Sequence, residues 1–316
     1  MGHEFTNAIK SWAIISIIAA HVYIDGNISL GLEYFKIFLN YFGTIGVGLF
    51  FIVSGYVWGN IGFNLKKSVS KLIIPWVISG SLIFLYVYVR KSDLDSDFFY
   101  SYLSFVLGQS SYLYYMSVYF IYILTARFWN VNLIGFIIFI VSLTYYIFKI
   151  PIFHTYFGVN EHLNPLLWFP YVYIGKYAKN ILSFLELFRL ETILIFSFII
   201  FLMSYYYYEY NINSYIVYFS LFRVYLTFLF FLSLYYLYPH FQVMNKFNIV
   251  GEQSLFIYLW HMPLVGILNF IGNNYIEELH YFSVLIVLSF FMLLVLFFRT
   301  KKNSFYSFIG FRGNDE

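Results

Sequence analysis

The stretch LIVLSFFMLLVLFF, residues 285–298, decides the fold, because only Ser289 interrupts its run of apolar side chains. A run of this kind favours a helix that crosses a lipid bilayer. The strands of a membrane β-barrel would instead alternate apolar and polar residues in segments of about ten. The sequence contains long apolar runs without this alternation, and it therefore predicts an all-α protein.

The composition extends this prediction to the whole chain. Hydrophobic residues make up 61% of the 316 residues, charged residues make up 10%, and the mean hydropathy is +0.75. A soluble domain carries about 25% charged residues, so most of this surface cannot face water. The net charge is +3, and the sequence has no run of basic residues that would bind nucleic acid. It also has no cysteine, which excludes thiolate metal sites. We expect a multi-pass protein whose main partner is the lipid bilayer.

About ten membrane spans are predicted, since each needs about 20 apolar residues. No linker is long enough to separate two domains, so residues 1–316 are expected to form a single helical bundle. The candidate spans are 9–25, 43–60, 72–90, 112–128, 131–149, 165–182, 190–209, 214–238, 249–272 and 281–299.

The distribution of basic residues predicts the orientation. If the N-terminus is cytoplasmic, most of the 18 Lys and Arg residues fall in inner loops, which is the bias expected of membrane proteins. An even number of spans then returns the C-terminus to the cytoplasm. The predicted outer loops include residues 91–97, 153–164 and 272–280, which are acidic and polar.

Two ionisable residues share one face of the first span. In IKSWAIISIIAAHVYIDG, residues 9–26, Lys10 and His21 are eleven positions apart, which is three helical turns plus about 20° and a rise of about 16 Å. Removal from water disfavours the charged imidazole, so His21 is expected to be neutral and able to accept a proton near the middle of the bilayer. Such residues mark functional sites by default, although a histidine that only bonds a neighbouring helix has the same pattern.

The second span and the lysines that follow it can be interpreted structurally or functionally. GVGLFFIVSGYVWG, residues 46–59, combines glycines that permit close helix packing with Phe50, Phe51 and Ser54. The structural interpretation is helix packing, with the Ser54 hydroxyl bonded back to its own helix. Lys67 and Lys71 follow in KKSVSKLIIPWV, residues 66–77, where they form an ordinary inner loop or bind the phosphates of a nucleotide-like cofactor.

The third segment is VGEQSLFIYLWHMPLVG, residues 250–266. His261 is about twelve residues into its span, and Pro263 removes one helix hydrogen bond and frees the carbonyl of Leu259. A kink beside a buried histidine would widen a pocket there.

In this order, the segments resemble the membrane acyltransferase-3 family, the integral-membrane O-acyltransferases of bacterial surface glycans. The resemblance covers most of the chain, although residues 185–245 carry little of it. The family has a basic residue, ten residues and a histidine in its first span, a Phe-Phe-x-x-Ser-Gly motif in its second, and a Gly-x-x-Ser-x-x-x-Tyr-Leu-x-His-x-Pro motif near its end. The matching residues here are Lys10 and His21; Phe50, Phe51, Ser54 and Gly55; and Gly251, Ser254, Tyr258, Leu259, His261 and Pro263.

The resemblance implies acyl transfer across a bacterial cytoplasmic (inner) membrane. The donor would be cytosolic acyl-CoA, most simply acetyl-CoA, with its phosphates near Lys10, Lys67 and Lys71. His21 would act as base or briefly carry the acyl group, with Lys10, Ser54 and His261 also placed in the catalytic site. The acceptor would be a hydroxyl of a surface polysaccharide or an undecaprenyl-linked glycan. The chain departs from the family at Asn7, where an acidic residue is usual, and at Ser68, where a basic one is usual.

Other polar residues have competing interpretations. Arg223 lies within a predicted span and is too costly to face lipid, so it is expected to pair with Glu252 or Glu209, or to bind a substrate phosphate. Phe50, Phe51, Arg223 and Glu252 are the candidate substrate-binding residues. His154, Glu161 and His162 lack the spacing of a metal site, and a solvated loop is the preferred interpretation there.

Two other functions are compatible with buried histidines and arginines. A flippase or exporter of glycan or acyl units would use similar residues, but it would show interrupted helices in both halves of the chain, whereas GTIGVG, residues 43–48, occurs in one half only. A non-catalytic envelope scaffold would leave the two buried histidines unexplained.

Overall fold

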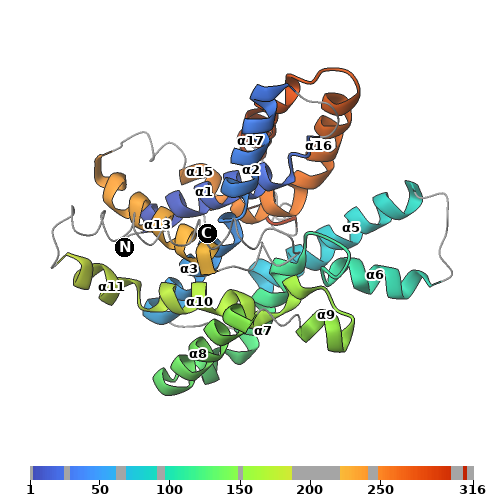
Figure 1. Cartoon of the computed structure of the whole chain (residues 1–316). Coiled ribbons are helices and arrows are strands. Elements are labelled where there is room, and N and C mark those ends of the chain that lie inside the picture. The colour runs from blue at the N-terminus through green and yellow to red at the C-terminus, as the bar shows by residue number, and fades with distance from the viewer. Residues whose placement is uncertain are drawn as a thin grey trace.

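The structure is a computed structural model that describes residues 3–24, 29–61, 69–90, 97–148, 152–186, 221–240, 248–299 and 309–311. Every secondary-structure element in these ranges is helical (Figure 1). The elements are α1 (His3–His21), α2 (Leu30–Gly43), α3 (Gly46–Ile61), the π-helix η1 (Val69–Ile73), α5 (Ile74–Arg90), α6 (Phe98–Val106), α7 (Tyr114–Trp129), α8 (Asn132–Phe148), α9 (Ile152–Phe157), the 3-10 helix η2 (Glu161–Leu163), α10 (Pro165–Lys176), α11 (Ala178–Leu185), α13 (Leu221–Leu237), the 3-10 helix η4 (Tyr238–His240), α15 (Asn248–Glu252), α16 (Ser254–Asn274) and α17 (Leu279–Arg299).

The described helices confirm a membrane protein but not a count of ten spans. Four helical stretches within the described ranges are long and apolar enough to cross a bilayer, and the shorter apolar helices α8 and α13 accompany them. The predicted span 190–209 and the first part of 214–238 lie outside the described residues. The long stretches are Leu30–Gly59, Val69–Val89, Ser254–Asn274 and Leu279–Phe298.

The boundaries of the first predicted span are wrong, because the helix runs from His3 and ends at His21 instead of continuing to residue 25. The second predicted span, 43–60, agrees with α3 to within three residues. The helix α2, which precedes α3 and is separated from it by only a short turn, was not predicted. The helix α2 escapes a search for apolar runs because it buries only one narrow stripe, which includes Leu32 and Leu39, and carries Glu33 on another face. The short helix α6 was likewise not predicted.

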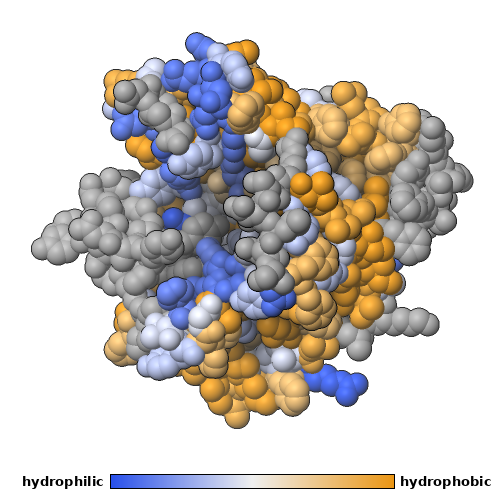
Figure 2. Space-filling view, turned by 90° about the vertical axis from the view of Figure 1, so that its right-hand side faces the viewer, coloured by the Kyte–Doolittle hydropathy of each residue, from blue (hydrophilic) through white to orange (hydrophobic). Residues whose placement is uncertain are grey.

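The helices around α1 position the site. Along the chain α1 contacts α2, α3, α15 and α16, so it runs through the middle of the bundle. Figure 1 shows α2, α16 and α17 gathered at the top of the view, and α5 with α6 projecting to the right. Figure 2 shows broad hydrophobic surface beside a hollow where hydrophilic side chains gather.

Glycines allow the central helices to approach closely, as the sequence predicted. A Cβ atom at Gly55 would lie 2.0 Å from the Val172 carbonyl oxygen, and one at Gly175 would lie 2.0 Å from the Ile52 carbonyl oxygen. Each helix therefore presents a glycine to the backbone of the other where α3 crosses α10. A Cβ at Gly251 would lie 1.9 Å from the Asn7 carbonyl oxygen, so α15 meets α1 in the same way.

Asparagine and proline together start α10 where the sequence changes from loop to helix. The Asn164 side chain accepts a hydrogen bond from the Leu166 N–H at 3.0 Å, and Pro165 occupies the first helical turn. Inside the helix Pro170 cannot bond the carbonyl of Leu166, and the Ser142 hydroxyl of α8 donates to that oxygen instead. Membrane helices tolerate proline when a neighbouring helix supplies such a partner.

Candidate active site

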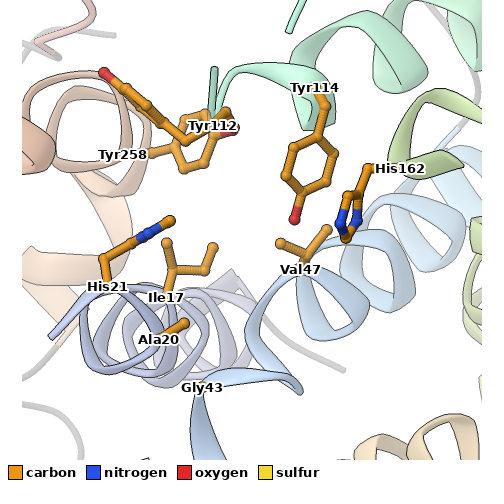
Figure 3. A pocket seen from close by; sticks show the side chains of 9 residues that line it. All are labelled: Ile17, Ala20, His21, Gly43, Val47, Tyr112, Tyr114, His162 and Tyr258. Atoms are coloured by element: carbon orange, nitrogen blue, oxygen red, sulfur yellow. The ribbon is translucent and has the colours of Figure 1, made fainter. Parts of the chain in front are cut away.

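A pocket of about 170 Å³ lies at the C-terminal end of α1. Its wall combines imidazole and phenol groups with small apolar side chains, and the residues come from distant parts of the chain (Figure 3). The lining residues are Ile17, Ala20, His21, Gly43, Val47, Tyr112, Tyr114, His162 and Tyr258.

His21 is the last residue of α1, and its side chain points into the pocket (Figure 3). The final carbonyls of a helix have no partner within it. Here the amide of Asn269 on α16 replaces that partner, because its Nδ2 donates to the His21 carbonyl at 2.9 Å and its Oδ1 accepts from the Tyr23 N–H at 3.1 Å. The helix end that carries His21 is therefore fixed by a second helix.

His261 lies next to His21 but does not line the pocket. The two imidazole rings are 5.3 Å apart between centroids, and His261 is fully buried. Because a carbonyl oxygen can only accept, Nδ1 of His261 donates to the Tyr258 carbonyl at 2.7 Å. The neutral ring then carries a lone pair on Nε2, an atom with no hydrogen-bond partner among the described residues. His261 is thus adjacent to His21 but outside the pocket lining, and its catalytic role stays a prediction.

The carbonyl that Pro263 frees finds a partner outside its helix, whereas the kink and the wider pocket expected there stay predictions. The Leu259 carbonyl that the proline frees accepts a hydrogen bond from the Tyr112 hydroxyl at 2.5 Å. In return, the Tyr258 hydroxyl donates to the carbonyl of Tyr112. The loop before α7 and the helix α16 are therefore tied together next to the two histidines, whose rings lie 6.3 Å (His21) and 5.3 Å (His261) from the Tyr112 ring.

The predicted lysines are divided between described and undescribed parts of the chain. Lys10 is half-buried on α1, and because α1 is one continuous helix, Lys10 and His21 share a face as predicted. Lys71 is half-buried in the π-helix η1, just before α5. Lys67 lies outside the described residues. None of the nine pocket-lining residues is a lysine, so any phosphate contact would be made away from the pocket.

The residues of the Phe-Phe-x-x-Ser-Gly motif pack the core beside the pocket. Phe50 and Phe51 are buried against aromatic rings, and both contact Tyr115. The Ser54 hydroxyl donates to the Phe50 carbonyl at 2.8 Å within its own helix. These contacts match the structural interpretation of the motif. The catalytic role of Ser54 and the substrate-binding roles of Phe50 and Phe51 stay predictions without support from their positions.

Arg223 and Glu252 are also placed outside the pocket lining. Arg223 is buried on α13, and Glu252 is half-buried at the end of α15. The Arg223 charge nevertheless acts near the pocket. Burial is the main reason why the pKa of His162 is lowered to about 4, and the positive charge of Arg223 is the second. Substrate binding by either residue stays a prediction.

The interpretation of residues 154–162 as a solvated loop is wrong for His162, which is half-buried and lines the pocket. It is correct for His154, which is exposed. Within the described residues no group of three metal-ligating side chains occurs. The pocket residues Tyr112, Tyr114 and His162 were not assigned to the site from the sequence, because nothing in their local pattern separates them from the many other aromatic residues of the chain.

The helices and the pocket define a membrane protein with a buried histidine site. The model of an acyltransferase family, described as an acyltransferase domain, matches residues 3–299. The chain therefore belongs to the acyltransferase-3 family and is a membrane acyltransferase. No curated protein and no solved structure matches it.

Proposed function

We propose that this chain moves an acyl group, most simply acetyl, from cytosolic acyl-CoA to a hydroxyl of a cell-envelope polysaccharide or lipid-linked glycan. The observation that carries the proposal is the position of His21, whose ring enters a pocket at one end of α1 while Lys10 lies on the same helix face. This arrangement separates a cation from a proton-accepting group by about 16 Å along one rigid helix. It suits a donor held at one side of a bacterial cytoplasmic membrane and an acceptor at the other.

His21 would act as general base in the transfer. Its ring nitrogen takes the proton of the acceptor hydroxyl while the hydroxyl oxygen forms a bond to the acyl carbon. The carbon–sulfur bond of the thioester then breaks, and the leaving thiolate recovers the proton from His21. A positioned histidine base contributes about 10²–10⁴-fold to a rate. A brief acyl bond to His21 would divide the same transfer into two steps with the same overall balance.

His261 would support this role from outside the pocket lining. Its Nδ1 proton is committed to the Tyr258 carbonyl, so the lone pair is on Nε2, a buried atom of a ring that lies 5.3 Å from the His21 ring. A fixed lone pair beside an imidazole favours the orientation in which His21 turns an N–H towards it. The other nitrogen of His21 would then be free of a proton and available to the acceptor hydroxyl.

The size of the pocket limits what it holds. An engineered cavity of about 150 Å³ binds one benzene molecule, so the 170 Å³ here suits an acyl group and the part of the acceptor that carries the reacting hydroxyl, but not a whole coenzyme. Lys10 and Lys71, with Lys67, are the residues proposed for the phosphates of CoA, because a cation on a flexible stem suits phosphate.

The test compares cells that express the wild type, His21→Ala and His261→Ala at equal membrane levels. The surface polysaccharide is analysed by mass spectrometry and NMR. We expect acyl esters with the wild type, none with His21→Ala, and fewer with His261→Ala, while the amount of surface glycan stays unchanged. Unchanged esters combined with loss of surface glycan would mean that the protein transports the glycan and does not acylate it.

A further inference from the structure

His162 is a second histidine in the pocket, and it faces His21 from the opposite side. Figure 3 shows His21 on α1 at one side of the pocket, with Tyr114 and His162 together at the other. His162 belongs to η2, between α9 and α10, and Tyr114 is the first residue of α7. The pocket therefore has one wall from α1 and an opposing wall made by chain segments outside the long apolar stretches.

Three contacts fix His162 in this wall. Its backbone N–H donates to the Asn160 side chain at 3.0 Å, and its backbone carbonyl accepts from the Trp168 indole N–H at 2.9 Å. Its ring lies 4.8 Å from the Tyr114 ring between centroids. With the backbone bonded on both sides and the ring packed, the imidazole is pre-organised, as binding side chains need to be.

The two loops that carry this wall are also joined to each other. The Gln109 side chain donates to the Gly158 carbonyl at 3.1 Å and accepts from the Asn160 N–H at 2.6 Å. Gln109 lies in the loop before Tyr114, and Asn160 lies two residues before His162. The segments that carry Tyr114 and His162 are consequently held together by Gln109.

We propose that His162 and Tyr114 bind the acceptor, and that they recognise an uncharged polyhydroxy group such as a neutral sugar residue. The proposal rests on the acyl transfer proposed above and names the acceptor side of that site. One hydroxyl of the acceptor would contact His162 or Tyr114, and the reacting hydroxyl would face His21 across the pocket. The donor side lies in the other direction, because Lys10 is on the same helix as His21.

The chemistry of this wall suits neutral hydroxyl groups. A neutral imidazole offers one donor and one acceptor, and a phenol offers the same pair, which matches the two functions of a sugar hydroxyl. Burial, followed by the charge of Arg223, lowers the pKa of His162 to about 4, although nearby Glu161 raises it. At neutral pH the ring is therefore uncharged and supplies no cation for a phosphate or carboxylate.

The test uses membranes from the cells that carry this protein, with the wild-type gene replaced by variants. Membranes receive radiolabelled acetyl-CoA, and alkali-labile label on the glycan measures transfer. In parallel, the thermal stabilisation of each purified protein by CoA measures the donor side. The variants are His162→Ala, His162→Gln and His21→Ala, and His154→Ala is the matched control, because His154 is exposed nearby in the chain and does not line the pocket.

We expect His162→Ala to lower transfer about tenfold, which corresponds to 1.4 kcal/mol, while stabilisation by CoA is unchanged. His162→Gln should recover part of the transfer because its amide keeps a donor and an acceptor, and His154→Ala should stay within about twofold of the wild type on the same scale. Equal transfer by His162→Ala and His154→Ala would overturn the proposal, as would loss of CoA stabilisation in His162→Ala. If the proposed acyl transfer itself is wrong, the result differs: either the wild type transfers no label to the glycan, or His21→Ala transfers as much label as the wild type.

Discussion

Asn269 is predicted to control the activity of His21 without touching the substrates. Its amide holds the last carbonyl of α1 and the N–H of Tyr23, at 2.9 and 3.1 Å. Asn269→Ala removes both bonds, and each is worth about 1 kcal/mol net. A loss of about 2 kcal/mol lowers the population of the correctly placed helix end by up to about thirtyfold. Since a displacement of about 1 Å can cost about 10²-fold in rate, we expect transfer to fall between about tenfold and thirtyfold.

The measurement is the rate of label transfer from radiolabelled acetyl-CoA to the glycan of isolated membranes, normalised to the amount of protein. Asn274→Ala is the matched control, because Asn274 is exposed on the same helix and its Nδ2 donates to the carbonyl of Phe270 in its own helix. Asn269→Asp separates the two bonds, since it keeps the acceptor for Tyr23 and loses the donor to His21.

We expect Asn269→Asp to be as inactive as Asn269→Ala, because its carboxylate would face the His21 carbonyl. The stabilisation by CoA should be unchanged in both variants, since the donor's phosphates are proposed to bind elsewhere. If Asn269→Ala matches Asn274→Ala in rate at equal membrane levels, the position of His21 does not depend on this clamp and the reasoning is wrong.

Three further predictions concern stability and are measured as thermal unfolding in detergent. Gly55→Ala should destabilise by about 1–3 kcal/mol, because its Cβ would meet the carbonyl of the facing helix at 2.0 Å, whereas Gly266→Ala, with nothing within 4 Å, should be neutral or stabilising. Tyr112→Phe should cost about 1–3 kcal/mol, because it leaves the Leu259 carbonyl without its donor; an unchanged Tm would contradict this account. Burial lowers the pKa of His162 from 6.5 to about 4, so the unfolded chain binds the proton first and stability falls as the pH drops through this window. His162→Gln should flatten that fall, and a pH dependence identical to wild type would count against it.

The parts of the fold that could be predicted are those where the apolar run alone determines the helix. The helix α17 begins within two residues of the predicted span and ends with it, and α8 agrees equally well. The helix α2 could not be found in this way, because Glu33 and other polar residues interrupt its apolar run while Leu32 and Leu39 face the core. Its burial depends on α1 and α17, which a local pattern does not include.

The residues of the site also fall into those that could be selected from the sequence and those that could not. His21 and His261 could be selected because an imidazole in an apolar run is costly wherever the helix goes, and the freed Leu259 carbonyl followed from the covalent geometry of Pro263. His162 could not be selected, because its burial comes from Trp168 and Tyr114, which pack around a loop. The burial of a loop depends on contacts with distant parts of the chain. The polar residues next to His162 in the sequence instead predicted exposure to solvent.

The groups that stabilise the fold near the pocket are also those that shape the site. A helix end and a proline-freed carbonyl leave backbone groups that require partners from elsewhere. Asn269 and Tyr112 provide these partners, and each bond lies within one turn of His21 or His261. Any substitution that gives these backbone groups other hydrogen-bond partners would therefore move a histidine. The stability of the protein and its rate of acyl transfer should consequently change together. Membrane abundance must accompany every activity measurement at this site, because a loss of transfer alone does not separate a misplaced His21 from an unfolded helix end.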